Sequence, residues 1–546
     1  MNAYLKKWWG WGDPHKRFSL ASRPSIFHFL QTQFDIKDKR FSPPHEKDIK
    51  LPESQLFQNE IKNLQALVGM ENIFYDHATR LSHCLGKSTP DLIHARYKKR
   101  EEAPDAVLFP KTESEVLNIL RFCGEQKISV VPFGGGSSVL GGVSPSRYTH
   151  HHAVITLNLQ KMNRVLNVDS SSHVACVQPG ILGPQLEEEL NRHHFTFGHF
   201  PQSFEFSTLG GWIATRGSGQ NSSYYGNISD LVVSVKIATP QGIIQTRTTP
   251  DSSTGPSLRQ LFIGSEGIFG VIVEAVIKIR PQTSSASYGT YLLPHFESGV
   301  TAIQKIKEEN FNPLIVRLSD VSETQISFKM GSTQGGLKTI LSYFVKLWMK
   351  FKKIKKEESC FLLVGFTGSK KDINHQKKRI RKMMKGSLSL GSKPGFTWHK
   401  SRFELPYLRD ELLDYGILVD TFETATLWHN LIPLYNKIQK EAYRILSPKS
   451  LLLCHISHTY DTGASLYFTF LTSFIENPLT QWRDIKKAVT RVILDNGGTL
   501  SHHHGIGKDH RDFLVDEHGG EFLNILKNIK QTLDPSGIMN PRKLIQ

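Results

Sequence analysis

The spacing of apolar positions changes period several times between residues 103 and 281. A short apolar run at residues 104–110 lies between prolines, and a β-branched run at residues 128–132 leads directly into glycines, so both predict buried strands. Between them, apolar residues recur at helical spacing and predict a helix over residues 114–125, with Ser114 as its N-cap. Further strands are predicted at residues 153–159, 173–177, 231–239 and 271–279. This order of strands and helices is typical of one α/β unit of ordinary domain size.

The rest of the chain divides around this unit. Residues 1–102 are polar with helical patches such as residues 53–68. Residues 282–500 mix strands with amphipathic helices, and residues 501–546 form a short tail that carries histidines and helices. We therefore expect four parts, an N-terminal helical extension (1–102), a first domain (103–281), a second domain (282–500) and a C-terminal segment (501–546).

Composition narrows the class of protein. The 546 residues carry 67 Lys and Arg against 50 Asp and Glu, a formal charge of +17, and 39% of them are apolar, which is the profile of a soluble globular protein. No run reaches the roughly 18 apolar residues that span a bilayer. The five cysteines are scattered and odd in number, which fits a reducing compartment without a disulfide framework. The charge predicts an anionic partner, either nucleic acid, a membrane surface or a phosphorylated small molecule.

Three glycine-rich segments lie within residues 103–281. The first, residues 131–142, places three consecutive glycines directly after a predicted strand, where their backbone N–H groups and the hydroxyls of Ser137 and Ser138 suit a pyrophosphate. It is neither a Walker A loop nor a Gly-x-Gly-x-x-Gly helix start, and such a loop alone is more often only a turn. The others span residues 201–219 and 263–272. Together the three segments offer a lining as long as a dinucleotide.

In order and spacing, these segments resemble the FAD-binding domain of the vanillyl-alcohol-oxidase (PCMH) type flavoproteins. The resemblance implies an α+β fold with a PCMH-type FAD-binding domain (103–281), a substrate or cap domain (282–500) and a histidine-bearing segment (501–546) that returns to the active site. Since the first loop has neither His nor Cys, we expect non-covalent FAD. The resemblance implies FAD contacts at Pro132, Phe133, Gly134, Gly135, Gly136, Ser137, Ser138, Gln202, Ser203, Phe204, Glu205, Phe206, Ser207, Thr208, Thr215, Arg216, Gly217, Ser218, Glu266, Gly267, Ile268, Phe269, Gly270, Val271 and Ile272.

Two segments of the C-terminal half indicate the branch of this superfamily. Relatives that oxidise 2-hydroxy acids carry a Gly-His-x-Gly-Asp-Gly-Asn-x-His and a Glu-His-Gly-Ile-Gly segment that can bind a metal. Here residues 454–468 place Tyr467 near the second histidine, and residues 501–507, Ser-His-His-His-Gly-Ile-Gly, replace the acid with His503. A metal site without its carboxylate is disfavoured, so we expect no metal.

These substitutions resemble the alkylglycerone-phosphate synthase (alkyl-dihydroxyacetone-phosphate synthase) family. The resemblance runs from near the N-terminus to Leu544. Shorter matches lie at residues 10–12, 203–208, 214–219, 225–230, 316–318, 407–410 and 422–424. It implies that the acyl group of 1-acyl-dihydroxyacetone phosphate is exchanged for a long-chain fatty alcohol, through a covalent intermediate at flavin N5 and without net redox change. The alternatives are an FAD-dependent 2-hydroxy-acid dehydrogenase or oxidase and, outside enzymes, a lipid-binding scaffold.

The resemblance also implies roles for single residues. Tyr467 matches a catalytic acid/base, Arg409 a substrate-binding arginine whose guanidinium suits a phosphate, and Arg317 an arginine needed for activity. Each has a plainer interpretation, since Tyr467 lies in an apolar strand, Arg409 could form a helix-face ion pair, and Arg317 has Asp320 nearby.

Two histidine triplets occur in the sequence. His502, His503 and His504 match histidines required for catalysis, and because successive strand residues alternate faces we expect two of them at the site and one supporting them. His150, His151 and His152 have no motif partner, and we interpret this triplet as a solvated surface loop.

The last expectations concern partners and location. Residues 335–356 have helical apolar spacing with flanking lysines, which predicts a basic amphipathic helix at a membrane surface, although a helix packed on the core has the same pattern. Residues 1–12 mix aromatic and basic residues and are expected to pack their tryptophans on the body. We expect a homodimer that binds no nucleic acid. The chain shows no secretory signal and no terminal Ser-Lys-Leu, so we expect a cytoplasmic, peripherally membrane-associated enzyme, or a peroxisomal one if it is eukaryotic.

Overall fold

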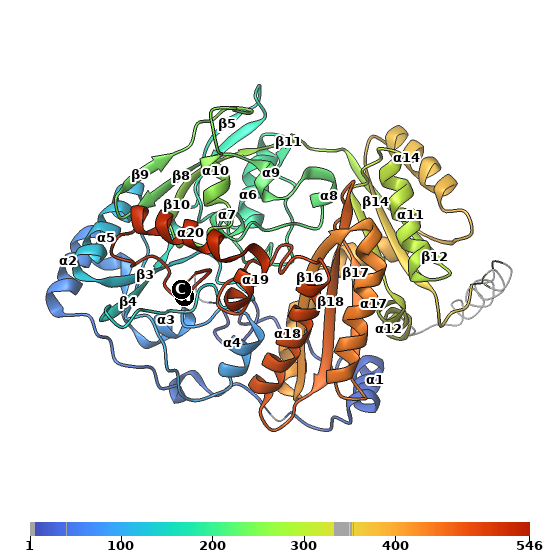
Figure 1. Cartoon of the computed structure of the whole chain (residues 1–546), viewed down its shortest axis with the longest axis horizontal. Helices are drawn as coiled ribbons and strands as arrows, with labels where there is room; N and C mark the ends of the chain where they lie inside the picture. The colour runs from blue at the N-terminus through green and yellow to red at the C-terminus, as the bar shows by residue number, and fades with distance from the viewer. Residues whose placement is uncertain (1–5, 40, 332–348, 350–351, 353, 546) are drawn as a thin grey trace.

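The N-terminal region adds both helices and one strand to the molecule. The structure, a computed structural model, describes residues 6–39, 41–331, 349, 352 and 354–545 (Figure 1). Within residues 6–102, β1 (Ile73–Phe74) pairs with a strand of the next unit, so this region is not only a helical extension. Its helices are α1 (Pro24–Phe34), α2 (Gln58–Val68), α3 (His77–Ser82) and α4 (Thr89–His94).

Two small sheets form the next unit. The first has the order β1-β2-β4-β3, in which β2 (Ala106–Leu108), β4 (Ala153–Asn158) and β3 (Ile128–Phe133) are parallel and α5 (Glu113–Gln126) connects β2 to β3. The second is antiparallel, in the order β5 (Val165–Asp169), β6 (Val174–Val177), β10 (Val271–Lys278), β8 (Val232–Thr239) and β9 (Gly242–Gln245). Val130, Ile155 and Val271 share one buried core, which joins the two sheets.

The strands and the helix predicted in residues 103–281 are confirmed, with shifted ends. The helix starts one residue earlier than expected, at Glu113, because the hydroxyl of Thr112 and not Ser114 caps it by accepting the Glu115 N–H at 3.1 Å. Likewise, the helix expected from residue 53 begins at Gln58, after an extended stretch.

The C-terminal half is built on one antiparallel sheet of seven strands. Its order is β15 (Leu388–Gly391), β12 (Ser285–Leu293), β14 (Cys360–Gly368), β13 (Ile315–Ser319), β17 (Leu451–Ile456), β18 (Gly463–Ser473) and β16 (Ile417–Leu427). Buried residues of this sheet pack against its helices in one large core, and α17 and α18 lie side by side along the β16–β18 edge in Figure 1. The helices are α11 (Phe296–Glu308), α12 (Val321–Gly331), α14 (Lys370–Met383), α15 (Lys393–Ser401), α16 (Leu405–Asp414), α17 (Trp428–Ile445) and α18 (Pro478–Asp495).

The end of the chain returns to the first unit. After α19 (Leu514–His518) and α20 (Gly520–Leu533), Met539 bridges to Val130 of β3, and the ammonium of Lys530 donates to the carbonyl of Ile268 at 2.8 Å. Residues from both ends of the sequence therefore complete the same core. The remaining elements are α6 (Gly183–Arg192), α7 (Leu209–Ala214), α8 (Ser222–Tyr225), α9 (Ile228–Leu231), α10 (Leu258–Phe262), β7 (Phe195–Thr196), β11 (Arg280–Pro281) and the 3₁₀ turns Glu46–Asp48, Met70–Asn72, Leu159–Lys161 and Arg511–Phe513.

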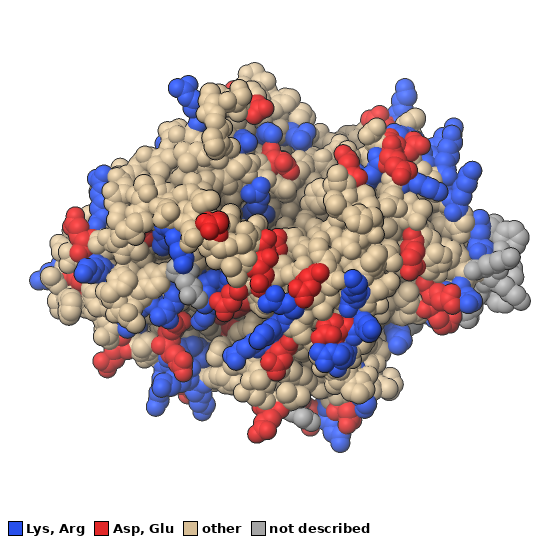
Figure 2. Space-filling view, in the orientation of Figure 1, with Lys and Arg blue, Asp and Glu red and all other residues tan. Residues whose placement is uncertain are grey.

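The surface carries a basic region in addition to the segment expected at residues 335–356. On the face in Figure 2 the charges of both signs are interspersed, and basic side chains gather at the upper right, over the region of α14. The basic residues of α14 are Lys370, Lys371, Lys377, Lys378, Arg379, Arg381 and Lys382. None of the helices in the described part of the chain combines the length and apolarity needed to cross a membrane.

Candidate active site

Three neighbouring strands place three polar side chains in a row. In the register of the sheet, Tyr467 of β18 lies opposite Glu423 of β16 on one side and His455 of β17 on the other. Directly opposed residues of antiparallel strands project from the same face, so the three groups share one face of the sheet. The rings of His455 and Tyr467 stack, with centroids 4.9 Å apart. Tyr467 therefore points out of the apolar strand toward polar partners, unlike a core tyrosine.

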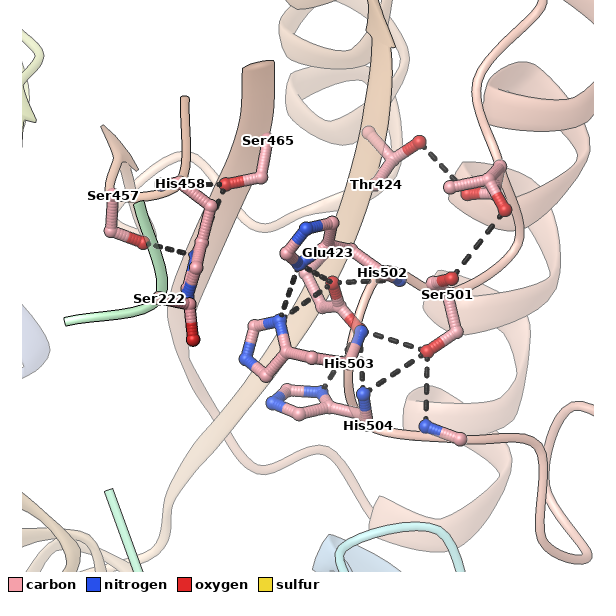
Figure 3. A network of polar contacts seen from close by, with 12 residues as sticks. Ser222, Glu423, Thr424, Ser457, His458, Ser465, Ser501, His502, His503 and His504 are labelled. Atoms are coloured by element: carbon pink, nitrogen blue, oxygen red, sulfur yellow. Dashed lines mark hydrogen bonds and ion pairs between the residues drawn. The ribbon is translucent and has the colours of Figure 1, made fainter. Parts of the chain in front are cut away.

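Glu423 organises the histidine segment. Its carboxylate accepts the backbone N–H groups of His502, His503 and His504 at 2.9–3.0 Å and the hydroxyl of Ser501 at 2.9 Å (Figure 3). Burial opposes ionisation, but the neighbouring imidazoles, His503 foremost, hold the pKa of Glu423 well below its usual value. An ionised carboxylate thus holds residues 502–504 in a bend. The prediction that two histidines lie at the site and one supports them assumed a strand, and that assumption is wrong.

The three imidazoles have different neighbours. His503 stacks on Tyr467 with centroids 5.8 Å apart, and His504 meets the same ring edge-on at 5.5 Å. His502 lies beside them, with Nδ1 2.9 Å from Nδ1 of His503 and Nε2 2.6 Å from the hydroxyl of Tyr460. Burial lowers the pKa of His502 to about 4 and that of His504 to about 3, and it raises the pKa of Tyr467 to about 12. At neutral pH, Tyr467 is a neutral phenol beside neutral His504.

Arg317 is paired, but not with the acid expected from the sequence. Its guanidinium donates to Glu323 of α12 at 2.5 Å and lies 3.0 Å from Nδ1 of His455. Asp320 instead accepts the hydroxyl of Tyr435 at 3.1 Å. Arg317 therefore acts on the site through His455, which stacks on Tyr467.

Arg409 carries an unpaired charge. It lies on α16, and among the described residues its guanidinium has no hydrogen-bond or ion-pair partner, with a buried Nε atom. In the adjacent Asp410, Oδ2 accepts the N–H of Trp11 at 2.6 Å, whereas the buried Oδ1 has no hydrogen-bond partner among the described residues. The plainer interpretation of Arg409 as a helix-face ion pair thus finds no support in the described residues. Its charge acts on Tyr467, whose pKa it lowers against the larger effect of burial.

The first glycine loop presents unused donors. Gly135 and Gly136 are buried, and the N–H groups of residues 135–138 bind no acceptor among the described residues. A Cβ atom on Gly135 would collide with the carbonyl of Phe206, so only glycine allows the first and second segments to approach this closely. Buried N–H groups without partners are rare in native proteins and fit the phosphates of a dinucleotide.

The third segment meets the others. Gly267 packs on Pro132, next to the first loop. Glu266 adopts a left-handed backbone with φ 50°, and its carboxylate accepts the N–H groups of Ile506 and Gly507 at 2.5 and 2.7 Å. Burial raises the pKa of Glu266 to about 7. Its side chain thus ties the expected cofactor site to the histidine segment, a role that its assignment as an FAD contact did not include.

The predicted absence of a metal is not settled by this geometry. In the described residues, nitrogens of His458, His502 and His503 lie within 4.8 Å of one another, a set that could hold a cation. His458 is also engaged otherwise, since one ring nitrogen lies 3.1 Å from the carbonyl of Gly219. The absence of a metal stays a prediction.

The second histidine triplet corrects an expectation. Only His150 is exposed, whereas His151 is buried between the hydroxyl of Ser129 at 2.7 Å and the carbonyl of Ser536 at 3.0 Å. His152 lies 3.1 Å from the carboxylate of Glu60. The segment is structural and not a solvated loop, because it fastens β3 to the C-terminal turn.

Known proteins match this chain in both halves. Residues 104–247 match the family model described as FAD binding domain, and residues 282–544 match FAD linked oxidases, C-terminal domain. An alkyldihydroxyacetonephosphate synthase of Dictyostelium discoideum is 33% identical over 99% of this chain and 93% of its own length, and that of Trypanosoma brucei brucei is 33% identical over 99% and 92%. A solved structure of an alkyldihydroxyacetonephosphate synthase has a TM-score of 0.84 at 30% identity, covering 100% of this chain and 98% of the other.

The chain belongs to the alkyldihydroxyacetonephosphate synthase family. As a member of this family it is an FAD-dependent enzyme, which agrees with the unused donors of the glycine loop. The vanillyl-alcohol-oxidase type of FAD-binding domain expected from the sequence is confirmed.

Several residues of the synthase site escaped the sequence analysis. Glu423 stood within a recognised motif, residues 422–424, but its role depends on contact with residues 501–504, which are far away in the chain. His455 and His458 stood within the matched segment 454–468 without an assigned role, and Glu323 had no local signal. The sheet register brings His455 to Tyr467, Glu323 reaches His455 from α12, and His458 packs on His502 from the segment after β17.

Proposed function

We propose that this protein exchanges the acyl group of 1-acyl-dihydroxyacetone phosphate for a long-chain fatty alcohol and releases the fatty acid. The bond from the substrate carbon to the acyl oxygen breaks, a bond from that carbon to the alcohol oxygen forms, and the alcohol loses a proton. The observation that supports this proposal best is Tyr467, faced by His503 and His504, with the unpaired charge of Arg409 close enough to act on it.

The residues divide the work as follows. FAD, when bound, supplies the nucleophilic centre through which the exchange proceeds without net redox change. The guanidinium of Arg409 binds the substrate phosphate, as a planar fork of donors suits phosphate oxygens. Tyr467 gives and takes the proton at the substrate carbon, and it is neutral before reaction because burial raises its pKa to about 12. Neutral His504 and the neighbouring His503 accept that proton or steady the departing carboxylate.

Glu423 and Arg317 position these groups. Glu423 holds the histidine segment by accepting four hydrogen bonds, three from backbone N–H groups and one from the hydroxyl of Ser501. Its charge favours a protonated imidazole during turnover. Arg317 and Glu323 fix the ring of His455 against Tyr467.

The proposal includes a membrane surface, since both alkyl substrates come from lipid, and a homodimer, which the family resemblance implies. The amphipathic helix expected at residues 335–356 lies mostly outside the described residues. At its end, Met349 and Ile354 are buried against Leu292 of β12. Vesicle co-sedimentation of the full chain and of a variant without residues 337–348 tests the membrane contact, and equal binding to anionic vesicles would oppose it.

The decisive experiment is an assay of the purified, flavin-loaded protein with dispersed acyl-dihydroxyacetone phosphate and hexadecanol. We expect an ether lipid and one free fatty acid per turnover. Dye reduction with lactate or glycolate serves as the comparison arm. A flavin-loaded protein that reduces dye and makes no ether would overturn the proposal in favour of a 2-hydroxy-acid dehydrogenase.

A further inference from the structure

The proposed exchange releases one proton for each ether that forms. The alcohol gives up its hydroxyl proton, and the acyl group leaves as a carboxylate at neutral pH, since carboxyl groups titrate well below pH 7. The histidines that accept this proton lie in a largely buried cluster, in which the side chain of Glu423 is only 2% exposed. The proton therefore needs a route from the histidines to water.

A row of polar atoms leads away from His503. Its Nδ1 lies 2.9 Å from Nδ1 of His502, and Nε2 of His502 lies 2.6 Å from the hydroxyl of Tyr460. The two nitrogens of His502 thus face different partners, one toward the reaction site and one away from it. Because an imidazole can take a proton at one nitrogen and release one from the other, His502 is placed to pass a proton between these partners.

Tyr460 brings this row to the surface. It is 37% exposed and lines a surface cavity of about 540 Å³, between the end of β16, the start of β18 and residues 497–499. Two acids of α19, Asp516 and Glu517, line the same cavity. Burial of its hydroxyl raises the pKa of Tyr460 to about 12, so it is a neutral phenol at neutral pH. Tyr460 therefore joins the largely buried His502 to an opening with polar walls.

The loop that carries Tyr460 is fixed to both halves of the molecule. The indole of Trp428, at the start of α17, donates to the carbonyl of Asp461 at 3.0 Å. On the other side of Tyr460, the N–H of Thr459 donates at 3.0 Å to the hydroxyl of Ser223 in α8. These contacts hold the backbone on each side of Tyr460, so the fold itself directs its hydroxyl at His502.

Glu423 is the competing acceptor for the same proton. Its carboxylate lies 3.2 Å from Nδ1 of His503 and 3.8 Å from Nδ1 of His502. It already accepts four hydrogen bonds, and the imidazoles hold its pKa well below the usual value, so it stays ionised and does not keep the proton. His458 packs on His502, but one of its ring nitrogens faces the carbonyl of Gly219. The contact with Tyr460 is therefore the one that leads outward.

We propose that His502 and Tyr460 relay the proton of the exchange from His503 to water. This inference rests on the proposed function, because it gives the proton released by that reaction its exit. Protonated His503 donates from Nδ1 to Nδ1 of His502, which releases the proton on its Nε2 to the hydroxyl oxygen of Tyr460. The hydroxyl passes its own proton to water. One proton leaves, Tyr460 and His503 end neutral, and His502 ends as its other tautomer.

The test compares Tyr460→Phe, which removes the hydroxyl and keeps the ring, with Tyr460→Ala, which opens the cavity toward Nε2 of His502. For Tyr460→Phe we expect kcat for ether formation to fall about 10–100-fold, with KM within about threefold and flavin content unchanged, because the loss concerns proton transfer and not binding. The solvent deuterium isotope effect on kcat should rise, since proton release becomes rate-limiting. In Tyr460→Ala, added imidazole should carry the proton and restore part of kcat.

Tyr97→Phe is the matched control, because Tyr97 is also exposed and lies beside a histidine, with its ring 5.7 Å from that of His94. We expect it to keep the wild-type kcat and isotope effect. An unchanged kcat in Tyr460→Phe would overturn the proposal and mean that the fatty acid carries the proton away. A lower kcat with an unchanged isotope effect and no rescue by imidazole would also overturn it, by making Tyr460 a packing residue.

A wild type that makes no ether lipid would refute the proposed function and leave the relay to a separate measurement. In protein with isotopically labelled histidine, the Nε2 resonance of His502, assigned by its loss in His502→Gln, reports the partner of that nitrogen. We expect Tyr460→Phe to shift this resonance and Tyr97→Phe to leave it in place. An unchanged resonance in Tyr460→Phe would overturn the contact on which the relay depends.

Discussion

The same tripeptide, His-His-His, serves opposite purposes at residues 150–152 and 502–504. In the first, the rings of His150 and His151 lie 4.2 Å apart, but the three side chains have separate surroundings, one exposed, one beside Ser129 and one beside Glu60. In the second, three consecutive N–H groups converge on the carboxylate of Glu423, and the rings of His503 and His504 pack on Tyr467. The comparison teaches that the same tripeptide takes different surroundings when a buried carboxylate binds its backbone N–H groups, because its rings are then directed to other partners.

The largest expected difference is between the tyrosines beside the two triplets. Tyr467→Phe removes the acid/base hydroxyl and should lower turnover at least about 100-fold, with FAD still bound. Tyr148→Phe, which alters the ring stacked on His150, should keep wild-type turnover. Ether-lipid formation and the flavin absorbance of both variants provide the measurement. Substantial turnover in Tyr467→Phe would remove this residue from its role.

The second largest difference in turnover is expected between variants of the two acids that contact the triplets. In Glu423→Gln an amide replaces the buried charge, and its NH₂ group meets backbone donors, so we expect a loss of about 3 kcal/mol in the local stability of residues 501–504. Turnover should fall about 10–100-fold. Glu60→Gln, which alters the acid beside His152, should leave turnover unchanged.

Hydrogen exchange of the amides of residues 502–504 checks the cause. Their protection should drop in Glu423→Gln and stay intact in Glu60→Gln. Equal loss of turnover in the two variants, or unchanged protection in Glu423→Gln, would contradict the contrast between the triplets.

The smallest effect is in acid sensitivity. Burial lowers the pKa of His504 to about 3, whereas a histidine of the unfolded chain titrates near 6.5. The contribution of this neutral histidine to the stability of the fold is therefore complete above pH 6.5 and decreases as the pH falls toward 3. At pH 5 the free energy of unfolding is therefore lower by about 2 kcal/mol because of this histidine. His504→Gln should lose that part of the acid sensitivity, measured as the change in urea midpoint between pH 7 and pH 5. His150→Gln should behave as wild type, and an equal response of the two variants would refute the difference.

Local patterns predicted the first half of the molecule well. The runs at residues 128–132 and 271–279 form strands, and the glycines after the first of them present unused donors, because strand pattern and glycine chemistry are local properties. The predicted ends of helices were wrong by only a few residues where one side chain decides them, as with Thr112, which caps the helix in place of Ser114.

The second half was less predictable because its contacts cross long sequence separations. Tyr467 and Arg409 were named from motifs, but the partner of Arg317 was wrong by three residues, since a helical turn rather than chain proximity brings Glu323 to it. The environment of His151 depends on Ser536, 385 residues away. No periodicity in a sequence records such pairs.

The N-terminal arm, residues 6–12, docks Trp11 on α16, and this contact has a consequence for the order in which the protein is made. Trp11 and Asp410 are separated by 399 positions, so the arm leaves the ribosome long before its docking helix exists. Val130 likewise waits for Met539, near the other end of the chain. At a synthesis rate of about 5–20 residues per second, the arm remains without its partner for at least about 20 seconds. The contact between the arm and α16 is therefore completed late, and a chain released early from translation would carry its glycine-rich loops without this contact.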